Sequence, residues 1–210
     1  AKIGPDGKCR DEFPEDNPRF GGRTALCAYA LLAGGADPEN ETLNAAMKWL
    51  TQAELHGVYA VAMRVSALSA FPDRRVTDFL RRDVKWLIDA AAEDGAYTYT
   101  SSGGAKLEKW DNSNTQMAAL GVFSAMSRGV EAPLQYWRRM ERFWVAQQQP
   151  DGSWGYRLVD GAARTKTYGS MTAAGLATLY ACSDILRRED FVRCSAARGN
   201  QPIEKALAWI

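Results

Sequence analysis

The sequence predicts an all-α protein of about four helical hairpins in two layers. One observation is a helical signature with a central tryptophan that recurs along the chain at Ala46–Leu50, Asp83–Leu87, Glu141–Val145 and Ala206–Ile210. The other is that helices rich in Ala, Gly, Ser and Thr alternate with helices that carry Arg, Lys and Glu on one face. Small side chains let helix backbones approach closely, so we expect the first kind to form an inner layer and the second an outer layer.

The hairpins are expected within a single domain at residues 23–54, 56–92, 111–148 and 170–210. Apolar periodicity, together with Gly and Pro breakers, predicts helices over about 23–33, 41–54, 58–70, 74–92, 114–127, 133–148, 170–187 and 202–210. Residues 1–22 form a turn-rich lead-in to which no regular element is assigned. The connections 94–111 and 155–168 are long for a compact domain, and such loops are often functional.

A turn with glycine at its second position accompanies the helical signature. Residues 94–97 (Asp-Gly-Ala-Tyr) and 151–154 (Asp-Gly-Ser-Trp) are two copies, and residues 56–59 (His-Gly-Val-Tyr) are interpreted as a third. Residues 6–9 (Asp-Gly-Lys-Cys) resemble the end of a unit whose helix is missing. We expect Tyr97 and Trp154 to fasten neighbouring hairpins together.

The composition is that of an ordinary globular protein. Of 210 residues, 46% are hydrophobic and 24% charged, and 26 basic residues balance 25 acidic ones to a net charge of +1. This balance provides no overall field for nucleic acid or an anionic membrane surface. The longest apolar run, residues 25–33, is far shorter than the roughly 18 residues of a membrane span. We therefore expect no nucleic-acid partner and no membrane span.

Four cysteines, Cys9, Cys27, Cys182 and Cys194, form no Cys-x-x-Cys pair. Cys27 and Cys182 lie in small-residue helical runs and are expected to be buried thiols, while a disulfide between Cys182 and Cys194 stays an open alternative. The sequence predicts no compartment: residues 1–20 do not form a signal peptide, and export after cleavage of a leader is an alternative because the chain begins with Ala1.

One copy of the repeat resembles a known motif. Trp144, Gln148, Gly152 and Trp154 match the aromatic-x3-Gln-x3-Gly-x-Trp portion of the repeat in squalene and oxidosqualene cyclases, although Met140 stands where that motif has glycine. The whole chain is similar to prenyltransferase/squalene-cyclase-type repeats. The resemblance implies an α/α-toroid, in which inner and outer helices surround a central hollow. Relatives close the ring with more hairpins than four, which implies an open arc or a fragment of a longer protein.

The inner helices of such an array would begin at one rim. Helix N-termini carry unpaired N–H groups and the positive end of the helix dipole, so this rim would favour an anion, with Arg23 and Lys166 as cations. The alternative is that the rim residues only cap their helices. The candidate ligand-binding residues are Arg23, His56, Tyr59, Tyr97, Trp110, Asp111, Asn112, Ser113, Asn114, Gln116 and Ser170.

The segment from Trp110 to Ala118 resembles, in place and flanks, the Asp-x-Asp-Asp-Thr-Ala motif with which class II terpene cyclases protonate an alkene. Ser113 replaces the central acid, and a hydroxyl is too weak an acid for that step. Asp111 and Asn114 are the remaining candidates for catalysis, while Ser113 or Asn114 as a helix N-cap would explain the polar cluster without function. Prenyltransferase relatives bind zinc through Asp, Cys and His, but His56 is the only histidine, so no metal or cofactor is expected.

Six aromatics in the two long loops could line a pocket: Tyr97, Tyr99, Trp110, Trp154, Tyr156 and Tyr168. We expect a binding scaffold for an elongated apolar or anionic small molecule, or for a protein segment such as the remainder of a parent chain. The alternative is a prenyltransferase- or cyclase-like enzyme that acts on an isoprenoid and is completed by residues outside this chain. A carbohydrate-active toroid is a third hypothesis, which rests on the loop aromatics and fold analogy.

Overall fold

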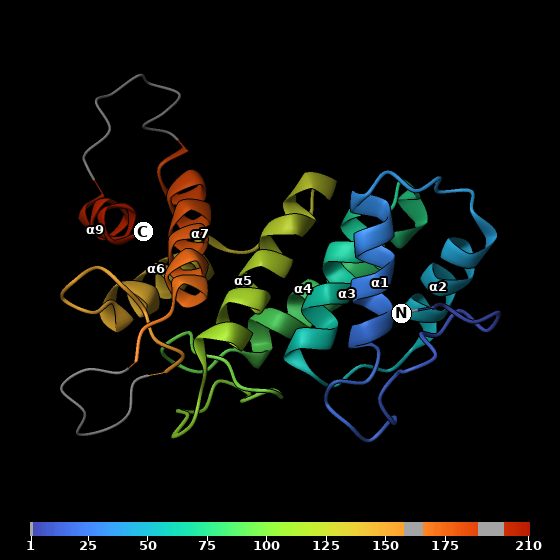
Figure 1. Ribbon diagram of the computed structural model, residues 1–210, viewed down its shortest axis with the longest axis horizontal. Coiled ribbons are helices and arrows are strands. Elements are labelled where there is room, and N and C mark those ends of the chain that lie inside the picture. Colours follow the sequence, from blue (N-terminus) through green and yellow to red (C-terminus); the bar gives the residue numbers. More distant parts are fainter. Residues whose placement is uncertain (1, 158–165, 189–199) are drawn as a thin grey trace.

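The computed structural model describes residues 2–157, 166–188 and 200–210, and these residues form an all-α structure (Figure 1). The described part contains eight α-helices and no β-strand, which confirms the all-helical prediction. The helices are α1 (Gly22–Ala33), α2 (Glu41–Gln52), α3 (Val58–Ala70), α4 (Thr77–Ala90), α5 (Asn112–Ala125), α6 (Leu134–Gln147), α7 (Gly169–Leu186) and α9 (Gln201–Trp209). Short 3-10 turns at Arg74–Val76 and Met126–Arg128 precede α4 and follow α5.

The helices form two rows. In the inner row α1, α3, α5 and α7 lie side by side, each in contact with the next, and all four begin along the same edge (Figure 1). The outer helices pack behind this row: α2 contacts α1 and α3, α4 contacts α3 and α5, and α6 and α9 contact α7. Every outer helix therefore depends on the inner row for its buried face.

Small residues explain why the inner helices pack so closely. A Cβ atom added to Gly121 on α5 would lie 3.0 Å from the Cα atom of Ala62 on α3, so the two backbones are nearly in contact. Gly22 on α1 faces Tyr59 and Ala60 of α3 in the same way. The outer helices are instead amphipathic. On α4, for example, Leu87 is buried while Lys85 is exposed.

Three Asp-Gly turns fasten the outer row. Gly7, Gly95 and Gly152 have φ angles of 79°, 99° and 94°, which L residues rarely adopt. Each glycine lies against the backbone of an outer helix. An added Cβ would approach the carbonyl oxygens of Ala45 on α2, Arg139 on α6 and Lys205 on α9 at 2.2, 3.3 and 2.4 Å. A turn can rest on the neighbouring helix in this way only if it lacks a side chain.

The last residue of each turn links the turn to the inner row, and in two of the three turns this residue is aromatic. Trp154 is fully buried, donates its indole N–H to the Trp144 carbonyl (2.9 Å) and its backbone N–H to Oγ1 of Thr172 on α7 (3.2 Å). Gln148 donates to the carbonyls of Gly152 (2.9 Å) and Pro202 (2.8 Å), which joins the turn to the start of α9. The residues that match the cyclase repeat motif thus connect α6, α7 and α9.

Tyr97 makes the equivalent link one repeat earlier. It is fully buried, its hydroxyl donates to the Leu87 carbonyl of α4 (2.7 Å), and its backbone N–H donates to Oγ1 of Thr115 on α5 (3.1 Å). In the lead-in, Cys9 occupies the same place and donates its backbone N–H to Oγ1 of Thr24 on α1 (2.8 Å). The lead-in therefore carries the same kind of turn as the later repeats.

The interpretation of residues 56–59 as a further copy of this turn is wrong. Gly57 has a φ of −103° and is the N-cap of α3, so the chain passes directly from α2 into the next helix. A Cβ at Gly57 would lie 1.5 Å from the Pro18 carbonyl oxygen. The glycine is required there because the lead-in crosses the start of α3, and a local pattern does not reveal that contact.

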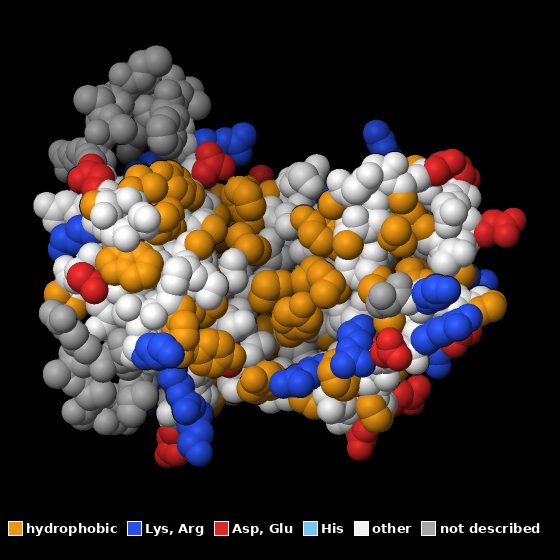
Figure 2. Space-filling model, in the orientation of Figure 1, with side chains coloured by type: hydrophobic (Ala, Val, Ile, Leu, Met, Phe, Trp, Pro, Cys, Tyr) orange, Lys and Arg blue, Asp and Glu red, His pale blue; other side chains and the backbone are white. Residues whose placement is uncertain are grey.

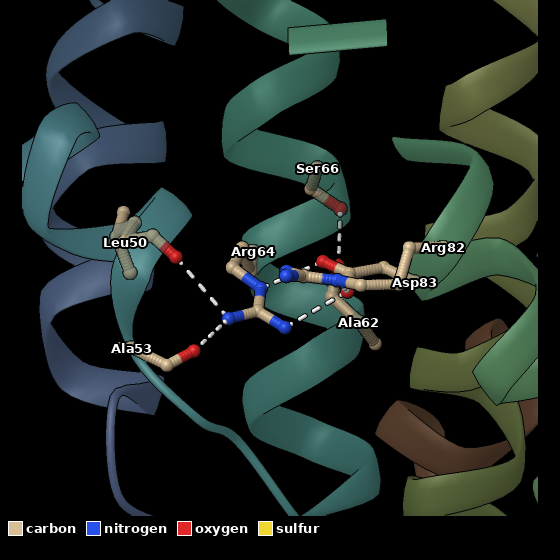
Figure 3. A network of polar contacts seen from close by, with 7 residues as sticks. All are labelled: Leu50, Ala53, Ala62, Arg64, Ser66, Arg82 and Asp83. Atoms are coloured by element: carbon tan, nitrogen blue, oxygen red, sulfur yellow. Dashed lines mark hydrogen bonds and ion pairs between the residues drawn. The ribbon is translucent and has the colours of Figure 1, made fainter. Parts of the chain in front are cut away.

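A buried ion pair joins α2, α3 and α4 at this place (Figure 3). Arg64 of α3 donates from Nε and Nη2 to both carboxylate oxygens of Asp83 on α4, at 2.6 and 2.8 Å. Its Nη1 donates to the carbonyls of Leu50 (3.1 Å) and Ala53 (2.6 Å) at the end of α2. Burial lowers the pKa of Arg64, and the Asp83 charge opposes that shift. The guanidinium thus satisfies carbonyls that the helix end leaves unpaired.

Candidate functional site

The first turns of α1, α3 and α5 surround a pocket of ≈ 320 Å³. Its wall combines three lead-in residues, the first turns of the three helices and two loop tyrosines. The lining residues are Phe13, Pro18, Arg19, Gly22, Arg23, Leu26, Tyr59, Tyr99, Ser113, Asn114 and Tyr156. The structure therefore brings Arg23, Tyr59, Ser113 and Asn114, four of the residues proposed from sequence, into one site.

Two arginines give the pocket its positive charge. The guanidinium of Arg23 lies 4.0 Å from the ring centroid of Phe13 and donates to the Asp11 carbonyl. That of Arg19 lies 5.7 Å from the Phe13 centroid and 5.6 Å from the Tyr99 centroid. Aromatic faces attract a cation and restrict its side chain, so both guanidinium groups are held at the wall while Arg19 and Arg23 stay exposed.

The tyrosine hydroxyls are kept protonated. Partial burial, the neighbouring Asp111 carboxylate and hydrogen bonds with Tyr99 and Asp111 raise the pKa of Tyr156 to about 12. Burial also raises the pKa of Tyr59. Near neutral pH both hydroxyls are protonated, and that of Tyr59 can act as a hydrogen-bond donor to a negatively charged or carbonyl-bearing ligand.

Asp111 has a structural role in capping α5. Its Oδ1 accepts from the backbone N–H of Asn114 (2.7 Å), and its Oδ2 accepts from Nδ2 of Asn114 (2.8 Å). The helix begins at Asn112, so the prediction that Ser113 or Asn114 caps it is wrong. Asp111 is the N-cap because its carboxylate reaches the backbone N–H of Asn114, three residues further on, as N-cap side chains commonly do. Asp111 is buried, and both of its carboxylate oxygens are engaged in these contacts.

Several N–H groups that were expected to be free at this rim already have partners. The N–H of Val58 donates to the Tyr99 carbonyl (3.0 Å), that of Asn112 to the Tyr156 carbonyl (2.9 Å), and that of Thr24 to Oε2 of Glu12 (2.7 Å). The segments after the turns thus contact nearby helix starts and satisfy their N–H groups: two reach back to a preceding helix, and Glu12 reaches forward to α1. The positive charge at this rim therefore lies mainly on Arg19 and Arg23, and less on the helix ends than the sequence predicts.

Three of the candidates from the sequence serve the packing instead. Tyr97 is fully buried in the core and is not among the residues that line the pocket. Trp110 is half-buried and meets Phe143 of α6 edge to face, with ring centroids 5.3 Å apart. Asn112 is buried and donates from Nδ2 to the Gly155 carbonyl (2.9 Å). These contacts hold the long loops against the helices.

The remaining candidates also lie outside the pocket wall. His56 and Ser170 are exposed, and Gln116 is half-buried on the second turn of α5. Lys166, proposed as a second cation, lies 5.3 Å from the ring centroid of its neighbour Tyr168. The second cation at the pocket wall is Arg19, which the sequence did not single out.

Sequence reasoning also missed Phe13 and Pro18. Together with Arg19 they lie in the lead-in, for which the sequence predicts neither a regular element nor a function, and no local pattern distinguishes these three residues. The only signal was indirect: the glycines at positions 21 and 22 allow the lead-in to approach Leu55 and Tyr59 closely. Tyr99 and Tyr156, by contrast, belong to the loop aromatics that were expected to line a pocket, and both do so.

A larger hollow of ≈ 930 Å³ lies toward the C-terminal ends of the inner helices. Its wall includes Tyr29 of α1, Ser66 of α3, Phe123 of α5 and Asp184 of α7. On the face that Figure 2 draws, apolar side chains gather over the middle, and Lys and Arg side chains lie along the edge where the inner helices begin. The face thus changes from charged at one edge to apolar in the middle.

In the part of the chain that the structure describes, no group of three or more His, Cys, Asp and Glu side chains is arranged to hold a metal ion. No helix within residues 2–157, 166–188 and 200–210 has the length and apolar character needed to cross a membrane. Cys182 is buried, Cys27 is half-buried, and Cys194 lies outside the described residues. Neither a scan against models of protein families nor a search of curated proteins gave a match for this chain.

Proposed function

We propose that the chain is an arc of an α/α-toroid, similar to those of prenyltransferases and squalene cyclases, and that it acts as a binding scaffold. Its ligand is a small molecule with an apolar body and an anionic end, bound at the pocket between α1, α3 and α5. The observation that carries this proposal is the pairing of two aromatic-backed arginines with an apolar wall in one ≈ 320 Å³ pocket.

The arrangement of the repeat supports the kinship with toroids. Trp144, Gln148, Gly152 and Trp154 all take part in the contacts that join one hairpin to the next. A motif that resembles the cyclase repeat in sequence therefore also has a repeat-joining role here. The parallel inner row with outer helices behind it is the arrangement that an arc of such a ring requires.

The chemistry of the wall defines the ligand. Arg19 and Arg23 suit a phosphate or carboxylate, since guanidinium groups form strong charge-assisted hydrogen bonds with both. The rings of Phe13 and Tyr59 and the side chain of Leu26 offer apolar contact. Leu26 is 43% exposed, and Tyr29, three residues further along α1, lines the larger hollow. An elongated ligand can therefore extend from the pocket along α1.

The surroundings of Asp111, the acidic candidate for catalysis, favour binding over catalysis. The Asp111 carboxylate is buried and engaged by Asn114, and Ser113 occupies the place of the central acid of the cyclase motif. An isoprenoid-acting enzyme remains the alternative, and it requires an acid or metal ligands from residues beyond this chain. The alternative predicts turnover, whereas the scaffold predicts binding without a product.

Isothermal titration calorimetry with three probes tests the proposal: farnesyl diphosphate, farnesol and inorganic pyrophosphate. We expect farnesyl diphosphate to bind more tightly than either part, because only the intact molecule uses both halves of the pocket. Arg23→Ala should weaken that binding by about tenfold, or roughly 1.4 kcal/mol. Arg81→Ala is the matched control, because Arg81 lies on α4 away from the pocket and its side chain is 64% exposed.

Two results would contradict the proposal. Absence of a heat change with all three probes would remove the pocket as a site for this ligand class. Equal binding of farnesol and farnesyl diphosphate, unaffected by Arg23→Ala, would exclude recognition of the anionic end. Release of pyrophosphate from farnesyl diphosphate over hours, measured by ³¹P NMR, would favour the enzyme instead.

A further inference from the structure

Two cysteines that belong to different parts of the chain lie next to each other. Cys9 follows the Asp6-Gly7 turn of the lead-in and is buried, while Cys27 is half-buried on α1. The backbone N–H of Cys9 donates to Oγ1 of Thr24 (2.8 Å). Thr24 and Cys27 are three residues apart on one helix, so their side chains share a face of α1. The hydrogen bond to Thr24 therefore places Cys9 beside Cys27.

The two thiols lie close enough to affect each other's titration. Burial raises the pKa of Cys27, and the neighbouring Cys9 raises it further through its charge and through a hydrogen bond between the two side chains, with a smaller effect from Glu12. A disulfide requires the two Cα atoms to lie within about 7 Å, and a backbone hydrogen bond from Cys9 to the residue one helical turn before Cys27 fits that requirement. Cys182, the other described cysteine, lies on α7.

We propose that Cys9 and Cys27 are a redox-modification site at which a small-molecule disulfide, such as glutathione disulfide, oxidises the pair to an intramolecular disulfide bond. The Cys9–Cys27 bond joins the lead-in to α1. This inference does not depend on what the pocket binds.

The reaction proceeds in two exchanges. Cys27, the more exposed of the two, loses its proton to solvent and attacks glutathione disulfide as its thiolate, which its raised pKa makes the minor form near neutral pH. A mixed disulfide forms, and one glutathione thiolate is released and takes up a proton. Cys9 then loses its proton and attacks the Cys27 sulfur, which expels the second glutathione. Two S–H bonds are lost and one S–S bond is formed in the protein, while the oxidant is reduced to two thiols.

The Cys9–Cys27 bond closes a loop that contains several residues of the pocket wall. Phe13, Pro18, Arg19 and Arg23 all lie between the two cysteines in the sequence, and all four line the pocket. Closing a loop of this length reduces the conformational freedom of the unfolded chain, so the oxidised protein should be the more stable form. The reduced form keeps the lead-in in place through weaker contacts, such as the hydrogen bond to Thr24.

The experiment treats the folded protein with glutathione disulfide, blocks the remaining thiols with iodoacetamide and maps the peptides by mass spectrometry. We expect a cross-linked peptide pair that contains Cys9 and Cys27 and disappears on reduction. Oxidation should raise the melting temperature by roughly 5–10 °C. Cys27→Ser should abolish both the cross-link and this rise, whereas Cys182→Ala should keep both.

Three outcomes would overturn the proposal: Cys9 and Cys27 both alkylated after oxidation, glutathione adducts without a cross-link, or a cross-link to a different cysteine. If Cys27→Ser does not fold, the peptide map of the unsubstituted chain still decides. If oxidation yields the cross-link without raising the melting temperature, the bond strains the fold and the proposed stabilising role is wrong.

Discussion

The molecule joins its outer helices in two different ways. Between α6 and α9 the connection is the buried Trp154 with the turn at Gly152, whereas between α2 and α4 it is the ion pair of Arg64 and Asp83. The second occurs where the chain passes from α2 to α3 without an Asp-Gly turn. The comparison shows that one structural requirement can be met by a repeated local motif or by a single long-range polar contact.

The two connections have different energetics. Burial of an indole is favourable in itself, and Trp154 also satisfies its N–H group. A buried ion pair must first overcome the loss of hydration of two charges, so its net contribution is small although the loss of one partner is severe. Arg64 and Asp83 are 3% and 2% exposed, so both charges are almost completely removed from water. The following predictions separate the two cases.

Trp154→Ala should have the largest effect, a loss of about 3–5 kcal/mol in the free energy of unfolding measured with guanidinium chloride. The substitution leaves a large cavity between α6 and α7 and removes the bond to the Trp144 carbonyl. Trp154→Phe keeps most of the volume and should lose clearly less. Equal losses for the two variants would show that the indole N–H dominates and not the packing.

Asp83→Ala should lower the free energy of unfolding by about 3 kcal/mol, because it leaves the Arg64 guanidinium buried without its partner. The double variant Arg64→Met with Asp83→Leu removes both charges and should stay within about 1 kcal/mol of the unsubstituted protein. Urea unfolding of the three proteins checks this. A double variant as unstable as the single one would mean that Arg64 also stabilises the fold through its hydrogen bonds to the α2 carbonyls.

Gly152→Ala should have the smallest of the three effects, about 2 kcal/mol, because the new side chain meets both a positive φ and the backbone of α9. Gly129→Ala is the matched control: its φ is 72°, but nothing lies within 4 Å of the added Cβ. It should lose about 1 kcal/mol from conformation alone. Thermal unfolding of both variants measures the difference between their losses in stability, and this difference isolates the contact with α9. Identical losses would show that the Gly152 turn does not pack against α9.

The parts that could be predicted from sequence are those with local periodicity. The helices, their alternation and the role of Trp154 follow from patterns that repeat, and their boundaries agree within a few residues. The Arg64–Asp83 pair could not be predicted because its members are 19 residues apart and look like ordinary surface charges. For the same reason the pocket was only half predicted: Arg23 and Tyr59 stand at helix starts, whereas Arg19 reaches the site through the path of the lead-in.

The near-contact of Gly121 with Ala62 also has a consequence for selectivity. With the backbones of α3 and α5 this close, the two helices cannot slide or separate without losing their packing, so their first turns, which line the pocket, keep a fixed spacing. Adjustment to different guests must then come from the flanking rings, those of Phe13, Tyr99 and Tyr156, which stand on non-helical chain. If the pocket binds a ligand as proposed, the packed helices limit the width of that ligand, and the rings on the non-helical segments can adjust to its shape.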